Sequence, residues 1–175
     1  MRRLMLLRHA KTEHDAPSGH DQDRRLDDRG RLDAAAVGGW IGRHLPIPEV
    51  VLVSTAVRAQ QTWDLAWLAM KDRIAAPRVE HLDELYGAEP TQLLKILRLA
   101  EAQAPKQIML VGHNPGLHDF VLRLTREDEN ALREQVSGNL PTAAAVMIEL
   151  PANRWNEVEW GSGQIRELIL PRELS

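Results

Sequence analysis

The chain has 175 residues, of which 43% are hydrophobic, a formal net charge of -3 and no cysteine. This length predicts a single domain over residues 1–175 that buries about 70% of its unfolded surface and folds alone. Interspersed acidic and basic residues argue against nucleic acid or a membrane surface as a partner, and the lack of cysteine excludes disulfides, thiolate metal sites and cysteine nucleophiles.

The first predicted element is a buried strand at residues 4–7, an apolar run that ends abruptly in Arg8 and His9. This run is too short for the core of a secretory signal, which needs about 7–15 apolar residues. No later run approaches the ~18 apolar residues of a membrane span. We therefore expect a cytoplasmic protein that has no membrane partner.

Helices and strands alternate after this first strand. Residues 14–25 are polar and predict a loop, and a helix capped by Asp27 or Asp28 is expected to run to about Leu45. The next strands are predicted at residues 50–53, 79–82 and 108–111. The next helices are predicted from a Ser54-Thr55 cap to Met70, at residues 91–102 and after the turn at 112–116.

The last third of the chain is less regular. Residues 125–137 are charged and aperiodic, which predicts a surface excursion, either helix or loop. Residues 143–150 and 165–170 predict strands, antiparallel at the edge of the sheet, with Trp155 and Trp160 covering one side. The whole order predicts an α/β fold, a three-layer α/β/α domain with helices on both faces of a mostly parallel central sheet.

Three of the predicted strands lead to cationic or imidazole side chains. The first ends in Arg8 and His9, the second leads to Arg58, and the strand at 108–111 leads to His113. The carboxyl ends of parallel strands share one edge of the sheet, so these four side chains are expected to converge. Two guanidinium groups and two imidazoles, with no acidic partner evident beside them in the sequence, predict a phosphate site.

The segments that carry these residues resemble the histidine phosphatase superfamily. They are Arg8-His9 after a strand, STAVRAQQT (residues 54–62) at a helix start and VGHNP (residues 111–115) after a later strand. The compact length and these segments are most similar to the SixA-type phosphohistidine phosphatase branch, over residues 4–150. The resemblance implies a phosphoglycerate mutase-like fold. The superfamily often has glycine after the first histidine, where this chain has Ala10, a change that small branches accept.

The resemblance also implies a role for each residue. His9 matches the nucleophile that becomes a phosphohistidine, Arg8 and Arg58 match the pair that binds the phosphoryl oxygens, and His113 matches the second histidine of the pocket. A neutral imidazole is a competent nucleophile at neutral pH, and fixed arginines stabilise the charge of the transition state. No metal or other cofactor is expected, because no carboxylate cluster suited to magnesium follows a predicted strand.

Glu84 is the candidate proton donor, because it follows the predicted strand at 79–82, although an ordinary loop role fits it equally well. The alkoxide leaving group of a phosphoester has a conjugate-acid pKa of about 15.7 and needs such a donor. The imidazole that leaves from phosphohistidine needs far less help. The open role of Glu84 therefore fits a protein phosphohistidine phosphatase.

Two alternatives stay open at this point. One is a general phosphomonoesterase of small phosphorylated metabolites, and the other is a non-catalytic phosphohistidine-binding module. The partner is expected to be a phosphorylated protein or a small phosphate. A metal site is a weaker interpretation of the loop at 14–25, because its candidate ligands lack a regular spacing and favour a solvated loop; these are His14, Asp15, His20, Asp21 and Asp23.

Overall fold

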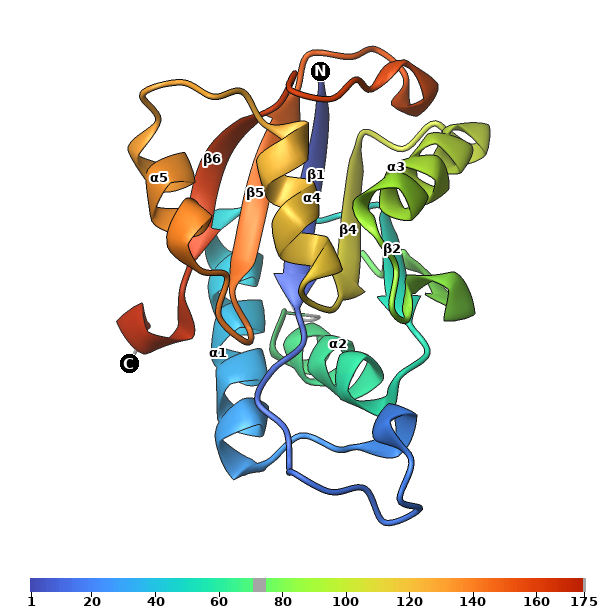
Figure 1. The fold of residues 1–175 in the computed structure, drawn as a ribbon, viewed down its shortest axis with the longest axis vertical. Helices are drawn as coiled ribbons and strands as arrows, with labels where there is room; N and C mark the ends of the chain where they lie inside the picture. The colour runs from blue at the N-terminus through green and yellow to red at the C-terminus, as the bar shows by residue number, and fades with distance from the viewer. Residues whose placement is uncertain (71–74, 175) are drawn as a thin grey trace.

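The computed structural model describes residues 1–70 and 75–174, which form a six-stranded sheet with helices on both faces (Figure 1). The strands are β1 (Arg2–Arg8), β2 (Val50–Ser54), β3 (Arg78–Leu82), β4 (Gln107–Gly112), β5 (Ala145–Leu150) and β6 (Gln164–Ile169). They lie in the order β3-β2-β4-β1-β5-β6. The first four run parallel, whereas β5 and β6 are antiparallel to their neighbours. The predicted mostly parallel sheet with an antiparallel edge is confirmed.

The helices begin and end close to the predicted positions. They are α1 (Asp28–His44), α2 (Val57–Met70), α3 (Pro90–Leu99), α4 (Gly116–Leu124) and α5 (Ala131–Gly138). Short 3-10 turns occur at η1 (Asp21–Asp23), η3 (Asp83–Leu85), η4 (Ala100–Gln103), η5 (Trp155–Glu157) and η6 (Pro171–Glu173). The Asp27 carboxylate accepts the N–H of Gly30 at 2.7 Å and so caps α1. No helix in the described ranges is long and apolar enough to cross a membrane.

Two apolar cores cover the two faces of the sheet. Successive side chains of a strand point to opposite faces, so Leu4 and Leu6 of β1 pack with α3, α4 and α5, whereas Met5 and Leu7 pack with α1 and α2. Trp155 and Trp160 belong to the first of these cores, as the sequence predicted. Figure 1 shows α3 and α4 in front of the sheet and α1 behind it. The three-layer α/β/α arrangement is confirmed.

The start of β5 differs from the prediction, and the excursion at 125–137 contains a helix, one of its two predicted forms. The strand expected from residue 143 begins at Ala145, because Ala143 has a φ of 62° and forms a turn against the end of β1. Its N–H lies 3.1 Å from the carbonyl oxygen of Arg8 and 3.0 Å from that of His9. The excursion at 125–137 contains α5, which buries only Val136 and therefore left no periodic signal in the sequence.

Candidate active site

The four predicted site residues meet at the shared edge of β1, β4 and β2, where the arrowheads of these strands lie together in Figure 1. Arg8 ends β1 opposite Gly112 of β4, and the N–H of His9 donates to the Gly112 carbonyl at 3.0 Å. This register places the rings of His9 and His113 with their centroids 5.3 Å apart. Arg58 lies in the first turn of α2, directly after β2. The predicted convergence of strand ends is what the structure shows.

His9 is held in one tautomer. Its Nδ1 lies 2.8 Å from the carbonyl oxygen of Ala10, and because a carbonyl only accepts, Nδ1 carries the ring hydrogen and Nε2 keeps its lone pair. Burial, and to a lesser extent the nearby His113, Arg58 and Arg8, lower the pKa of His9 to about 3, although the hydrogen bond to Ala10 acts in the opposite direction. The ring is therefore neutral at pH 7 and presents an unprotonated Nε2.

Thr62 joins the end of β1 to the first turn of α2. Its hydroxyl accepts the N–H of Ala10 at 2.9 Å and donates to the carbonyl of Arg58 at 2.7 Å. The side chain is fully buried. Sequence reasoning missed Thr62, although its position four residues after Arg58, on the same face of the helix, was a usable signal. One buried hydroxyl thus fixes the spacing between the His9 segment and the Arg58 helix.

His113 is positioned by Ser54, the last residue of β2. The Ser54 Oγ accepts the N–H of Ala56 at 3.2 Å and lies 2.8 Å from His113 Nε2. Among the described residues, Nε2 is the only acceptor within hydrogen-bond distance of the Ser54 hydroxyl hydrogen, so the hydroxyl donates to Nε2 and Nδ1 of His113 carries the ring hydrogen. Burial, aided by Arg58, lowers the pKa of His113 to about 4, so this ring is neutral as well. Ser54 was predicted only as a helix cap.

Arg58 has an acidic partner that was not evident in the sequence. Its Nη2 donates to the Asp21 carboxylate at 2.9 Å and its Nη1 donates to the Asp21 carbonyl at 2.8 Å. The hydroxyl of Tyr86 also donates to this carboxylate, at 2.5 Å. Asp21 and Tyr86 come from irregular segments, and neither was expected in the site. The loop at 14–25 therefore reaches the site through η1.

Three donors around His9 are buried without a protein partner. Within the described ranges, the buried side-chain nitrogens or oxygens without a hydrogen bond are Nε of Arg8, Nε of Arg58, Nδ1 of His113 and, at the far end of β1, Nε of Arg2. Unpaired buried donors cost free energy and are rare. The first three surround one imidazole. A cluster of N–H donors beside an unprotonated ring nitrogen suits an oxyanion such as phosphate.

Arg8 and Asn114 are held by one backbone carbonyl. Arg8 Nη1 donates to the carbonyl of Leu140 at 3.0 Å, and Asn114 Nδ2 donates to the same oxygen at 2.9 Å. The Asn114 Oδ1 accepts the N–H of His118 at 3.2 Å, in the first turn of α4. The segment before β5 thus fixes the guanidinium of Arg8.

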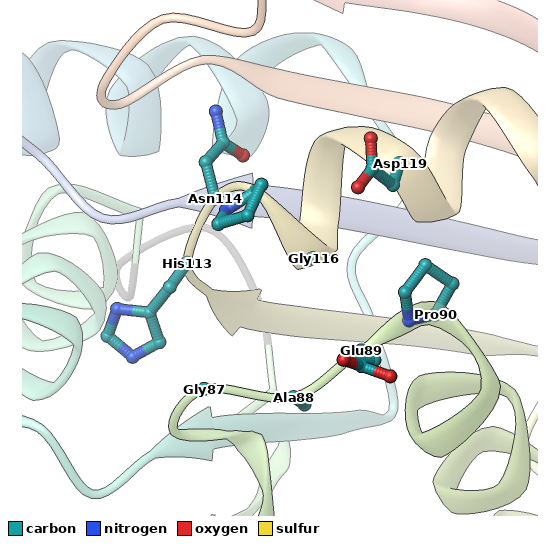
Figure 2. Close-up of a pocket in the computed structure, with 9 residues that line it drawn as sticks. Gly87, Ala88, Glu89, Pro90, His113, Asn114, Gly116 and Asp119 are labelled. Atoms are coloured by element: carbon teal, nitrogen blue, oxygen red, sulfur yellow. The ribbon is translucent and has the colours of Figure 1, made fainter.

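A pocket of about 290 Å³ opens beside His113. Figure 2 shows it between the segment 87–90 and the start of α4, with the His113 ring at one end and the carboxylates of Glu89 and Asp119 along it. Glu84, the candidate proton donor, is exposed in η3 and makes no hydrogen bond or ion pair with the four predicted residues in the described part of the chain.

The loop at 14–25 lines a separate pocket of about 330 Å³, which includes His14, Asp15 and His20. Over residues 1–70 and 75–174, no group of three or more histidine, aspartate or glutamate side chains is arranged to hold a metal ion. The described residues thus provide no metal-ligand set at either pocket. The observed role of this loop comes from Asp21, through its contact with Arg58.

Comparison with known proteins places this geometry in context. The family model of the histidine phosphatase superfamily (branch 1) matches residues 4–92. An uncharacterized protein of Mycobacterium tuberculosis strain H37Rv is 34% identical over 170 residues, which cover 95% of this chain and 100% of the relative. The structure of a candidate phosphohistidine phosphatase SixA from Agrobacterium tumefaciens is 25% identical with a TM-score of 0.79, over 97% of this chain and 98% of the other. The protein histidine phosphatase SixA complexed with tungstate shares the fold, with 20% identity and a TM-score of 0.77 over 99% of both chains.

Proposed function

Because the chain belongs to branch 1 of the histidine phosphatase superfamily, we propose that it hydrolyses a phosphoryl group through a covalent intermediate on His9 and that its substrate is phosphohistidine in a protein. The observation that carries this proposal is the unprotonated Nε2 of His9, fixed by Ala10 and surrounded by buried donors. A nucleophile next to oxyanion donors is the arrangement that phosphoryl transfer requires.

The reaction proceeds in two displacements. Nε2 of His9 attacks phosphorus, the bond from phosphorus to the substrate imidazole breaks, and that imidazole takes a proton from water. A second water then attacks the phosphoryl group on His9 and the P–N bond breaks, so that hydrogen phosphate leaves with one proton of that water and His9 is neutral again. The other proton of that water neutralises the hydroxide formed in the first displacement. The free donors of Arg8, Arg58 and His113 stabilise the equatorial oxygens in both transition states.

The choice of phosphohistidine rests on the leaving group. An alkoxide needs a proton donor, but Glu84 is exposed and makes no hydrogen bond or ion pair with the four residues in the described part of the chain. Asp21, the carboxylate that contacts Arg58, has a pKa lowered to about 2 and carries no proton at pH 7. An imidazole leaving group needs little protonation. The SixA names of the structural neighbours agree with this choice, which stays a proposal for this chain.

The substrate is tested by comparing hydrolysis of a phosphohistidine-bearing carrier protein with hydrolysis of a phosphoserine peptide and a sugar phosphate. We expect kcat/KM to be highest for the carrier protein. A preference for the esters would instead support a general phosphomonoesterase. In the same assays, Glu84→Gln is expected to change phosphohistidine hydrolysis by less than about twofold, whereas general-acid catalysis would predict a loss of about 100-fold or more.

To test the covalent step, the protein is mixed with ³²P-labelled phosphohistidine substrate and the reaction is stopped without acid. The residue of the protein that carries the label is then identified. We expect label on His9 of the wild-type chain and none on His9→Gln. Binding of the phosphorylated carrier without labelling or turnover by the wild-type chain would identify a binding module and overturn the proposal.

A further inference from the structure

Asp21 is the centre of a hydrogen-bonded group at the rim of the site. Its carboxylate accepts from Arg58 Nη2 at 2.9 Å and from the Tyr86 hydroxyl at 2.5 Å through Oδ2, and from Arg24 Nε at 2.9 Å through Oδ1. Its carbonyl accepts from Arg58 Nη1 at 2.8 Å. Arg58 itself is 6% exposed. One loop residue therefore engages both terminal nitrogens of a buried guanidinium.

The contact with Asp21 determines which hydrogen-bond donor of Arg58 remains unpaired. A guanidinium is planar and rigid, so fixing both terminal nitrogens fixes the direction of the Nε–H as well. That Nε is buried and has no hydrogen-bond partner among the described residues. The Asp21 contact thus leaves one oriented donor on Arg58 for a phosphoryl oxygen.

The turn that carries Asp21 is itself tied to the start of α2 and to η3. Gln22 Nε2 donates to the Thr55 hydroxyl at 3.1 Å, and that hydroxyl donates to Asp83 at 2.6 Å. Tyr86, which follows η3, also lies with its ring centroid 5.8 Å from the guanidinium carbon of Arg58. The position of Asp21 is therefore set by two other segments of the chain, the start of α2 and the η3 region, rather than by one surface ion pair.

On this basis, and resting on the proposed function, we propose that Asp21 is a positioning residue that orients Arg58 so that its Nε–H meets the phosphoryl group. The hydrogen bond from Tyr86, and then the interaction with Arg58, hold the pKa of Asp21 at about 2, so the acceptor is present throughout the neutral range. An alternative in which Asp21 merely competes with the substrate for Arg58 predicts the opposite effect of removing it.

The test compares two variants that remove the same charge. Asp21→Asn keeps a side-chain oxygen that accepts from Arg58 Nη2, whereas Asp21→Ala has none. The affinity of each for inorganic tungstate, a tetrahedral oxyanion that mimics phosphate, is measured by calorimetry. We expect Asp21→Ala to bind tungstate about threefold to tenfold more weakly than Asp21→Asn, and its kcat to fall more than its KM rises.

Asp23→Asn is the matched control. Asp23 lies in the same turn and accepts from the Ser18 hydroxyl at 2.6 Å, and the hydrogen bonds of the Arg58 side chain to described residues go to Asp21 instead. We expect wild-type tungstate affinity from this variant, and equal thermal unfolding midpoints for the two Asp21 variants. Equal tungstate affinities of Asp21→Asn and Asp21→Ala, tighter binding by Asp21→Ala, or no tungstate binding by the wild-type chain would overturn the inference. Absence of phosphohistidine turnover would overturn only the proposed function, because tungstate binding is measured without turnover.

Discussion

At the scale of single residues, two neutral imidazoles are fixed in complementary roles. Both carry their hydrogen on Nδ1, but His9 uses that hydrogen to bind Ala10 and leaves Nε2 as an acceptor. His113 accepts at Nε2 from Ser54 and leaves Nδ1–H as a donor. A backbone carbonyl and a serine hydroxyl thus decide which ring can act as a nucleophile and which can only donate a hydrogen bond.

The first prediction concerns the charge of these rings. With pKa values lowered to about 3 for His9 and about 4 for His113, neither ring should gain a proton as the pH falls from 8 to 5. The measurement is an NMR titration of the ring carbon and nitrogen shifts, assigned with His9→Gln and His113→Gln. A transition near pH 6.5, the value of a free imidazole, would contradict it.

The second prediction concerns Ser54. Ser54→Ala removes the donor to His113 Nε2, so the ring is free to place its hydrogen on either nitrogen and loses its fixed donor at Nδ1. We expect kcat to fall about fivefold, since one net hydrogen bond contributes about 1 kcal/mol. Steady-state kinetics and the NMR tautomer of His113 are the readouts. Full activity together with an unchanged tautomer would show that Ser54 does not position the ring.

At the scale of elements, close packing of α1 on α2 sets where Arg58 stands. A Cβ on Gly38 would lie 2.3 Å from the Cα of Ala66 and 2.4 Å from its carbonyl oxygen, whereas a Cβ on Gly39 would lie 3.2 Å from the flexible end of Arg43. Contact with backbone cannot be relieved by a rotamer change. Gly38 therefore allows α2 to approach α1 closely.

The third prediction follows from this packing. Gly38→Ala is expected to lower the free energy of unfolding by about 1–3 kcal/mol and to lower activity, because α2 carries Arg58. Gly39→Ala is the matched control in the same helix and is expected to be neutral or to stabilise by up to about 1 kcal/mol. The free energy of unfolding of both variants is measured with denaturant, and their kcat and KM are measured by steady-state kinetics. Equal stabilities would show that the two helices separate without cost.

The same element scale explains what the sequence could and could not predict. Arg8, His9 and His113 were predictable because each follows a continuous apolar run, the pattern of a buried parallel strand. Asp21 and Tyr86 were not, because they lie in segments without periodicity and reach the site only through tertiary contacts. The sheet order and α5 likewise depend on contacts between distant segments rather than on local pattern.

At the scale of the whole molecule, a site with polar groups in its interior lies at one edge of a sheet whose two faces are covered by apolar cores. The cores cover both faces of the sheet, while one sheet edge holds unpaired buried donors, the buried neutral imidazole of His9 and the half-buried neutral imidazole of His113. Such groups destabilise a fold unless a ligand satisfies them. The free energy of unfolding should therefore change when the histidines of the site gain protons.

The fourth prediction is a pH dependence of unfolding. The unfolded pKa of histidine is near 6.5, and the folded values of His9 and His113 are about 3 and about 4. The unfolded state thus binds more protons between these limits, so stability is fully present above pH 6.5 and is lost as the pH falls toward the folded pKa values. From pH 7.5 to 5.5 we expect a loss of about 1 kcal/mol for each ring.

The matching experiment measures the free energy of unfolding by urea at both pH values for the wild-type chain and for His9→Gln/His113→Gln. The double variant lacks the two rings, so its loss of stability over this window should be smaller than that of the wild type by about 2 kcal/mol. The difference between the two losses isolates these rings, because every other titrating group is common to both chains. Parallel pH profiles would mean that the two histidines titrate alike in the folded and unfolded states, and that the site edge is more hydrated than its burial indicates.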